Sequence, residues 1–141
     1  MASFKINTGI KTYDIENENG EVIGTIKINT TDINMFHRAK ETQERIKQLV
    51  DEVTANVSSD EDVINATYEC DQKIKAEINQ LFDDENLSNV VFGNQSCLNT
   101  LDGVTFVERF LNMVMPTIQA DFQSEMAKSS DRVKKYTSQV K

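Results

Sequence analysis

The sequence predicts an α+β protein that is mainly α. We expect an N-terminal β-hairpin or small sheet, then an antiparallel helical hairpin, a short helix and a long C-terminal helix kinked by proline. Two observations predict this class. An Asn-Gly pair separates two strand-like stretches near the N-terminus, and this dipeptide is a strong hairpin signal. After residue 31, apolar residues recur mostly at the spacing of amphipathic helices.

The N-terminal stretch "TYDIENENGEVIGTIKIN" places one strand on each side of Asn19-Gly20. A type I′ turn at these two residues requires a positive φ at both. Val22, Ile26 and Ile28 fall on one face of the second strand, with Gly24 between them. Because an isolated hairpin is only marginally stable in water, a third strand over residues 3–8, a helix or a partner chain must cover it.

Two amphipathic helices follow. Thr31 or Asp32 is placed to cap the first, which should run to about Asn56. Its apolar positions are Phe36, Ala39, Ile46, Leu49, Val50 and Val53. Ser59 and Asp62 form a capping pair for the second helix. Its stripe consists of Val63, Ala66, Cys70, Ile74, Ile78 and Leu81. The short connection predicts that the two helices pack antiparallel.

A double break interrupts the helical pattern in "LFDDENLSNVVFGNQSCLNTLDGVTFVERF" (residues 81–110). The acidic residues 83–85 oppose the helix dipole at the end of the second helix. They suit the N-terminal cap of a short helix over residues 86–92, which Gly93 closes. A long helix should start near Leu101 and bend at Pro116, because proline removes one backbone hydrogen bond. The break therefore predicts a corner in the chain.

The C-terminal segment carries the candidate partner-binding residues. The apolar members Ile118, Phe122, Met126, Val133 and Tyr136 form one narrow stripe, and the basic members are Arg132, Lys134 and Lys135. Such a stripe is too thin for a core but suits a groove on another protein. We expect a single compact domain over residues 1–115, comprising a β element (1–30) and a helical body (31–115). We expect residues 116–141 to form an arm that moves about Pro116, so that truncation after Pro116 leaves a folded body.

Charge narrows the choice of partners. The chain has 15 basic and 23 acidic residues, and its net charge of −8 argues against nucleic acid as a partner. Nine acidic residues against two lysines lie in residues 58–86, whereas residues 126–141 hold five basic residues and one acidic residue. This asymmetry favours head-to-tail contacts between copies. The absence of a long apolar run or a signal-peptide pattern predicts a cytosolic protein without a membrane partner.

The residue inventory predicts no enzyme, cofactor or metal. His37 is the single histidine, which excludes a catalytic triad or a histidine-rich metal site within one chain. Cys70 and Cys97 have no neighbouring ligand at metal spacing. An EF-hand loop starting at Asp83 would need Gly at its sixth position and Glu at its twelfth, where the sequence has Ser88 and Asn94.

The order of these parts resembles that of the tail-assembly chaperones of long-tailed bacteriophages and prophages. The resemblance, over residues 10–115, rests on the N-terminal β element, on "INTTDINMFHRAKETQERI", and on "IKAEINQLFDDENLSNVVFGNQSCLNTLDGVTFVERFL". In the family a helix ends in Phe and acidic residues, a Phe-Gly turn follows, and another helix opens. The family's break is richer in glycine, where this chain has Asp83, Asp84, Glu85 and Asn86.

The resemblance implies a non-enzymatic protein in the host bacterial cytoplasm that forms homo-oligomers. It also implies two clients. One is the tape-measure protein, which the chaperone keeps soluble, and the other is the tail-tube protein. Two alternatives stay open. The acidic residues 60–62 and 83–85 could imitate phosphates, making this a small acidic phage protein that inhibits a host nucleic-acid-binding or defence enzyme by mimicry. The other alternative is an enzyme whose site is completed across an oligomer.

Overall fold

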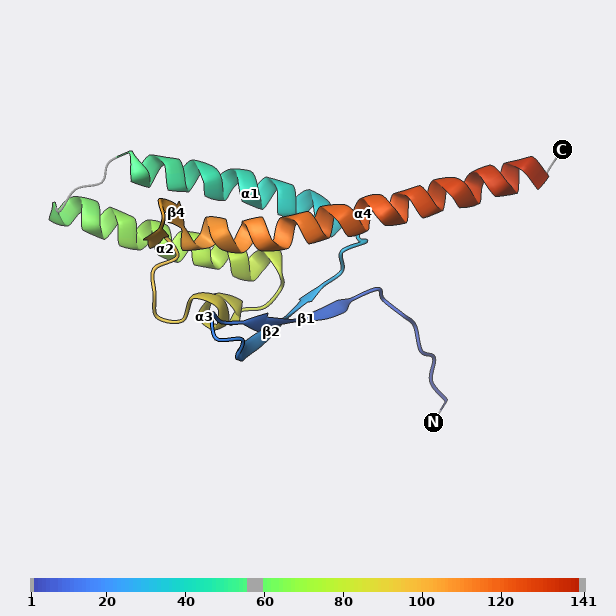
Figure 1. Ribbon diagram of the computed structural model, residues 1–141, viewed down its shortest axis with the longest axis horizontal. Coiled ribbons are helices and arrows are strands. Elements are labelled where there is room, and N and C mark those ends of the chain that lie inside the picture. Colours follow the sequence, from blue (N-terminus) through green and yellow to red (C-terminus); the bar gives the residue numbers. More distant parts are fainter. Residues whose placement is uncertain (1, 56–59, 140–141) are drawn as a thin grey trace.

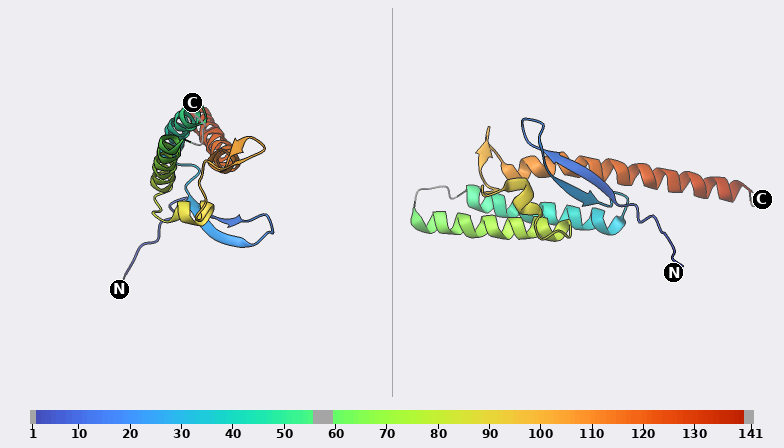
Figure 2. Two further views of the ribbon diagram at one scale, coloured as in Figure 1. Left: turned by 90° about the vertical axis from the view of Figure 1, so that its left-hand side faces the viewer. Right: turned by 90° about the horizontal axis from the view of Figure 1, so that it is seen from below.

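The computed structural model describes residues 2–55 and 60–139 (Figure 1). Its elements are β1 (Lys11–Glu16), β2 (Val22–Ile28), α1 (Ile33–Thr54), α2 (Glu61–Leu81), α3 (Leu87–Phe92), β3 (Thr100–Leu101), β4 (Val104–Thr105) and α4 (Phe106–Gln139). Figure 2 shows α1, α2 and α4 end-on, with α3 and the β1–β2 hairpin on one side of them. The predicted α+β class, mainly α, is confirmed.

The N-terminal hairpin forms where the sequence predicts it, but its turn is of another kind. In the antiparallel register, Tyr13 lies opposite Ile26. The Asn17 side chain accepts the backbone N–H groups of Asn19 and Glu21 at 2.9 and 3.0 Å. Gly20 has a φ of 78°, whereas Asn19 has no positive φ. The expected type I′ turn is therefore wrong, because the Asn17 side chain stabilises a turn that needs only one left-handed residue.

Helices, and not a third strand, cover this hairpin. Within the described residues its sheet contains two strands only, and residues 3–8 lie outside any strand. Ile26 and Ile28 are buried, and β2 packs on α3. Gly24 faces Val90 so closely that a Cβ at this position would overlap the Val90 Cγ1 atom. Gly24 therefore sets how near the hairpin approaches α3.

The helical hairpin forms as predicted. Asp32 is the N-cap of α1, and its carboxylate accepts the Asn34 N–H at 3.0 Å. The buried face of α1 consists of Met35, Ala39, Thr42, Ile46 and Val50. Met35 and Thr42 are additions to the expected list, and Phe36 is only half-buried. The predicted α1 end at Asn56 and the predicted cap Ser59 lie outside the described residues, and Asp60 caps α2.

The break forms a corner, as expected, with different details. Asn86 is the N-cap position of α3 and Gly93 closes the helix with a φ of 60°. The expected acidic cap is wrong. Asp84 instead accepts the Asn86 N–H at 3.0 Å in the preceding turn, where Asp83 has a φ of 51°. The Asp84 side chain and the left-handed backbone of Asp83 therefore shape a turn between the helices.

The expected start of the last helix near Leu101 is also wrong. Residues 100–105 form a small antiparallel hairpin. Its turn has two consecutive positive φ values, 54° at Asp102 and 82° at Gly103, as a type I′ turn requires. Helix α4 starts at Phe106, behind a capping box in which the Thr105 hydroxyl donates to Glu108 at 2.7 Å and accepts the Glu108 N–H at 3.2 Å.

Aromatic side chains hold the corner against α4. Phe92 packs edge-on against Phe106 and Phe110, with ring centroids 4.8 and 6.0 Å apart. Phe82 meets Phe110 in the same way at 6.0 Å. Helix α4 continues through Pro116 as one element, and Figures 1 and 2 show a gentle bend along it.

Candidate functional site

The structure divides the predicted stripe of α4 into a packed part and an exposed part. Ile118 is fully buried in the core, so the expectation that it needs a partner is wrong. Phe122 is half-buried and stacks on Phe36, with ring centroids 4.5 Å apart and an interplanar angle of 13°. Beyond it, Met126, Val133 and Tyr136 are 53%, 63% and 70% exposed.

The burial of Ile118 changes where a truncation can be made. A cut after Pro116 would remove a core side chain, and loss of a buried Ile destabilises a protein by about 2–5 kcal/mol even when only its outer atoms are deleted. The expectation that a cut after Pro116 leaves a folded body is therefore wrong for this core. The packed part of α4 ends at Phe122, and we call the exposed helical segment of residues 123–137 the distal arm.

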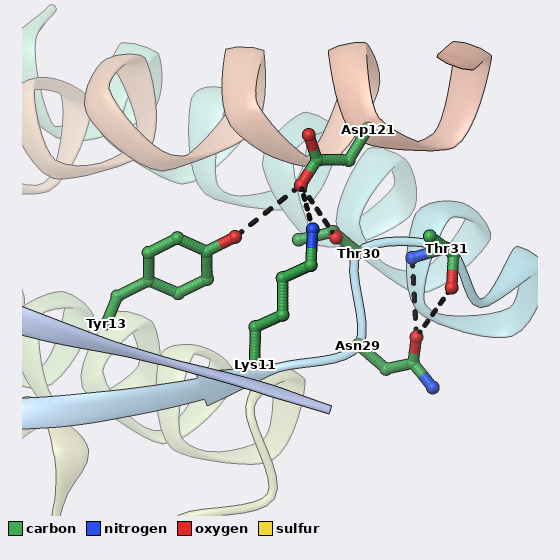
Figure 3. A network of polar contacts seen from close by, with 6 residues as sticks. All are labelled: Lys11, Tyr13, Asn29, Thr30, Thr31 and Asp121. Carbon is green, nitrogen blue, oxygen red and sulfur yellow. Dashed lines mark hydrogen bonds and ion pairs between the residues drawn. The ribbon is translucent and has the colours of Figure 1, made fainter. Parts of the chain in front are cut away.

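One carboxylate fixes the base of the distal arm to the body (Figure 3). The Oδ2 atom of Asp121 accepts a hydrogen bond from the Thr30 hydroxyl at 2.8 Å. The same oxygen lies 3.3 Å from Lys11 Nζ and 3.5 Å from the Tyr13 hydroxyl. The hydrogen bond from Thr30 lowers the pKa of Asp121; burial opposes this effect, and the Lys11 ammonium adds to it.

The Asp121 contacts join three parts of the fold. Lys11 and Tyr13 belong to β1, and Thr30 lies in the segment between β2 and α1. Asn29 supports that segment, because its side-chain oxygen accepts from the Thr31 N–H at 3.3 Å and the Thr31 hydroxyl at 3.0 Å. The direction in which α4 leaves the body is therefore set by specific polar contacts as well as by apolar packing.

The distal arm extends beyond the rest of the molecule. Figure 1 shows the end of α4 projecting past α1 and the hairpin, whereas the start of α2 lies at the opposite end. All side chains of residues 123–137 are exposed, including those of Arg132, Lys134 and Lys135. The exposed acidic residues 60–62 stand at the start of α2. The acidic residues 60–62 and the basic residues of the distal arm thus lie at opposite ends of the molecule.

Asp71, Lys75 and Cys97 form a buried polar cluster that the sequence did not predict. Asp71 on α2 is 4% exposed, accepts the Cys97 N–H at 2.7 Å and lies 3.2 Å from Lys75 Nζ. Burial raises the pKa of Asp71, but the hydrogen bonds from Cys97 and the Lys75 ammonium outweigh it, and the net shift is downward. Burial is the main cause that raises the pKa of the Cys97 thiol, and the hydrogen bond and negative charge of Asp71 raise it further. This cluster ties the loop before α4 to α2.

The single histidine lies on the surface of the body. His37 is exposed on α1, where its Nε2 lies 3.1 Å from Glu41. Across the described ranges, no group of three or more His, Cys, Asp or Glu side chains is placed to hold a metal ion. Among the helices described, none combines the length and apolar character needed to cross a membrane.

Comparisons with family models, with curated proteins and with solved structures find no significant match to this chain.

Proposed function

We propose that this protein is a phage tail-assembly chaperone that binds the tape-measure and tail-tube proteins in the host bacterial cytoplasm and self-associates without catalysing a reaction. The main support for this proposal is the exposed apolar surface of the distal arm. Met126, Val133 and Tyr136 remain at least half exposed on a helix that has already left the body. Exposed apolar side chains gathered on one projecting element are typical of a surface that binds a partner.

The geometry of the arm suits a helical client. Its 15 residues form about four helical turns with a length of roughly 22 Å. At 100° per residue, Met126 and Val133 lie nearly on one line, and Tyr136 lies beside them. The resemblance also implies that the tape-measure client has long helices, which the chaperone keeps soluble. An apolar stripe of this length would cover part of such a helix in the manner of helix-in-groove recognition.

The charge distribution supports self-association. The basic residues of the arm and the acidic start of α2 lie at opposite ends of the molecule (Figure 1). A copy could therefore place its arm near the start of α2 in the next copy without a clash of like charges. Such heterologous contacts generate rings or filaments, and salt would weaken them because the charges are exposed.

Mimicry of nucleic acid has weaker support. The two acidic clusters flank α2, with residues 60–62 at its start and residues 83–85 just after its end. A helix of 21 residues separates them by roughly 30 Å. Duplex DNA carries a charge about every 1.7 Å along its axis. Two clusters so far apart do not form a continuous row of charges.

Co-expression with the tape-measure protein of the same phage tests the proposal. Replacing Met126, Val133 and Tyr136 together by Ser should leave the chaperone folded and the client insoluble, because the stripe is lost. A matched control replaces Ser124, Lys128 and Asp131 by Gln on the opposite face of the arm, which leaves the net charge unchanged. The control should keep the client soluble. Equal client solubility with both triple variants would refute the proposal.

A further inference from the structure

The N-terminal segment has the side-chain pattern of a strand but belongs to no sheet. Phe4 is 104% exposed and Ile6 is 86% exposed. These apolar residues alternate with Lys5 and Asn7, as in a strand with one apolar face. Two large apolar side chains that share one face of an extended segment form a contiguous exposed patch, and such patches mark interaction sites.

The outer edge of β1 is open to receive a strand. The β1–β2 sheet has two strands, and within the described chain no backbone hydrogen bond joins residues 11–16 to any element but β2. An apolar groove of about 140 Å³ lies between β1 and α4, lined in part by Tyr13, Ile15 and Met113. Apolar cavities of about 150 Å³ are large enough for benzene. The groove therefore has room for one aromatic ring.

The segment is held away from the β1 edge of its own chain. The Asn29 side chain donates a hydrogen bond to the Thr8 carbonyl at 2.7 Å. Gly9 has a φ of 80°, and its N–H donates to the Asn7 side chain at 2.9 Å. Figures 1 and 2 show the chain before β1 leading away from the hairpin. These contacts thus favour pairing of residues 3–8 with the β1 edge of a different molecule over pairing with their own.

We propose that residues 3–8 of one copy add as a strand to the outer edge of β1 in a second copy. Phe4 or Ile6 then enters the groove beside Met113 of that copy. Side chains alternate in direction along both strands, so Lys5 falls on the face that carries Asp14 and Glu16, which are exposed. Apolar residues therefore meet on one face of the extended sheet and opposite charges meet on the other. This match favours residues 3–8 of a second copy as the strand that pairs with β1.

This strand exchange deepens the self-association in the proposed function and rests on it. Each copy has one donor segment and one acceptor edge. Head-to-tail exchange would then give a ring or a filament, and mutual exchange would give a two-fold dimer. Pairing would also protect an edge strand that is otherwise open to aggregation.

Disulfide trapping in the full chain tests the contact. One copy carries Ile6→Cys, and a second, distinguishable copy carries Met113→Cys. Mild oxidation should give mixed dimers in at least tenfold greater yield than when the second copy carries Ile64→Cys. Ile64 is a fair control because it is 55% exposed, close to the 59% of Met113. Equal yields would overturn the proposal. So would a link within one chain as the main product of the double variant Ile6→Cys, Met113→Cys.

Light scattering separates this contact from binding of the client. Replacing Phe4 and Ile6 by Asp should weaken self-association at least tenfold, whereas Gln48→Glu with Asn94→Asp adds the same charge at exposed positions outside the segment and the groove and should have a smaller effect. Unchanged association of the Phe4, Ile6 variant would overturn the strand exchange, as would a wild-type protein that stays monomeric at high concentration. The distal arm is intact in this variant. A failure of the client-binding proposal would instead appear with the Met126, Val133, Tyr136 variant.

Discussion

Replacing Asp71 by Ala should destabilise the fold strongly. The change leaves the Cys97 N–H and the Lys75 ammonium without their acceptor, and both lie in a buried region. Removing one partner of a buried ion pair lowers the free energy of unfolding by about 3–5 kcal/mol. The Lys75 side chain is 15% exposed and gains some hydration, so we expect a loss of about 3 kcal/mol. For a chain of this size, that loss lowers Tm by roughly 10 °C.

Chemical denaturation of the wild type, Asp71→Ala and the control Glu69→Gln measures this loss. Glu69 is exposed on the same helix, so its replacement should change the free energy of unfolding by less than about 0.5 kcal/mol. Folding lowers the pKa of Asp71. The charged carboxylate therefore stabilises the fold above its ordinary pKa of about 3.9, and this contribution disappears as pH falls through the lower folded value. Equal stabilities of Asp71→Ala and Glu69→Gln near neutral pH would refute the reasoning.

Three further predictions concern single sites. Gly24→Ala should cost about 1–3 kcal/mol through overpacking against Val90, and thermal melts should show a smaller loss when Val90→Ala is present as well. Asp121→Ala should cost about 1–3 kcal/mol in urea unfolding because the buried Thr30 hydroxyl loses its acceptor; an unchanged midpoint would contradict this. His37→Ala should leave client solubility unchanged in co-expression, and loss of solubility by a folded variant would show that His37 takes part.

Local sequence signals predicted most of the fold because they depend on neighbours in the chain. Asn19-Gly20 located the first hairpin and Asp32 located the start of α1. Asp102-Gly103, and Thr105 with Glu108, are signals of the same kind, and Gly103 does supply a turn. The apolar pattern of α4 continues back to Leu101, however, and hides the strand pair and the cap at Thr105. A short strand pair has too few residues to show its own period.

Contacts between distant residues could not be predicted in the same way. Asp121 meets Thr30 across 91 residues of sequence, and Asp71 meets Cys97 across 26. A carboxylate on an amphipathic helix has the pattern of a solvent-exposed side chain until its partner is known. The burial of Ile118 is hidden from the sequence for a related reason. Helical spacing gives the face of a side chain but not the point along the helix where the body ends.

Hydrogen–deuterium exchange of the full chain with and without the tape-measure protein tests the central claim most directly. The backbone amides of residues 123–137 belong to an exposed helical segment that makes little contact with the body, so they should exchange quickly in the free protein. If the distal arm binds the client, exchange in these residues should slow at least tenfold, while exchange at the buried positions of α2 changes little. Unchanged exchange in residues 123–137 under conditions where the client is bound would contradict the account.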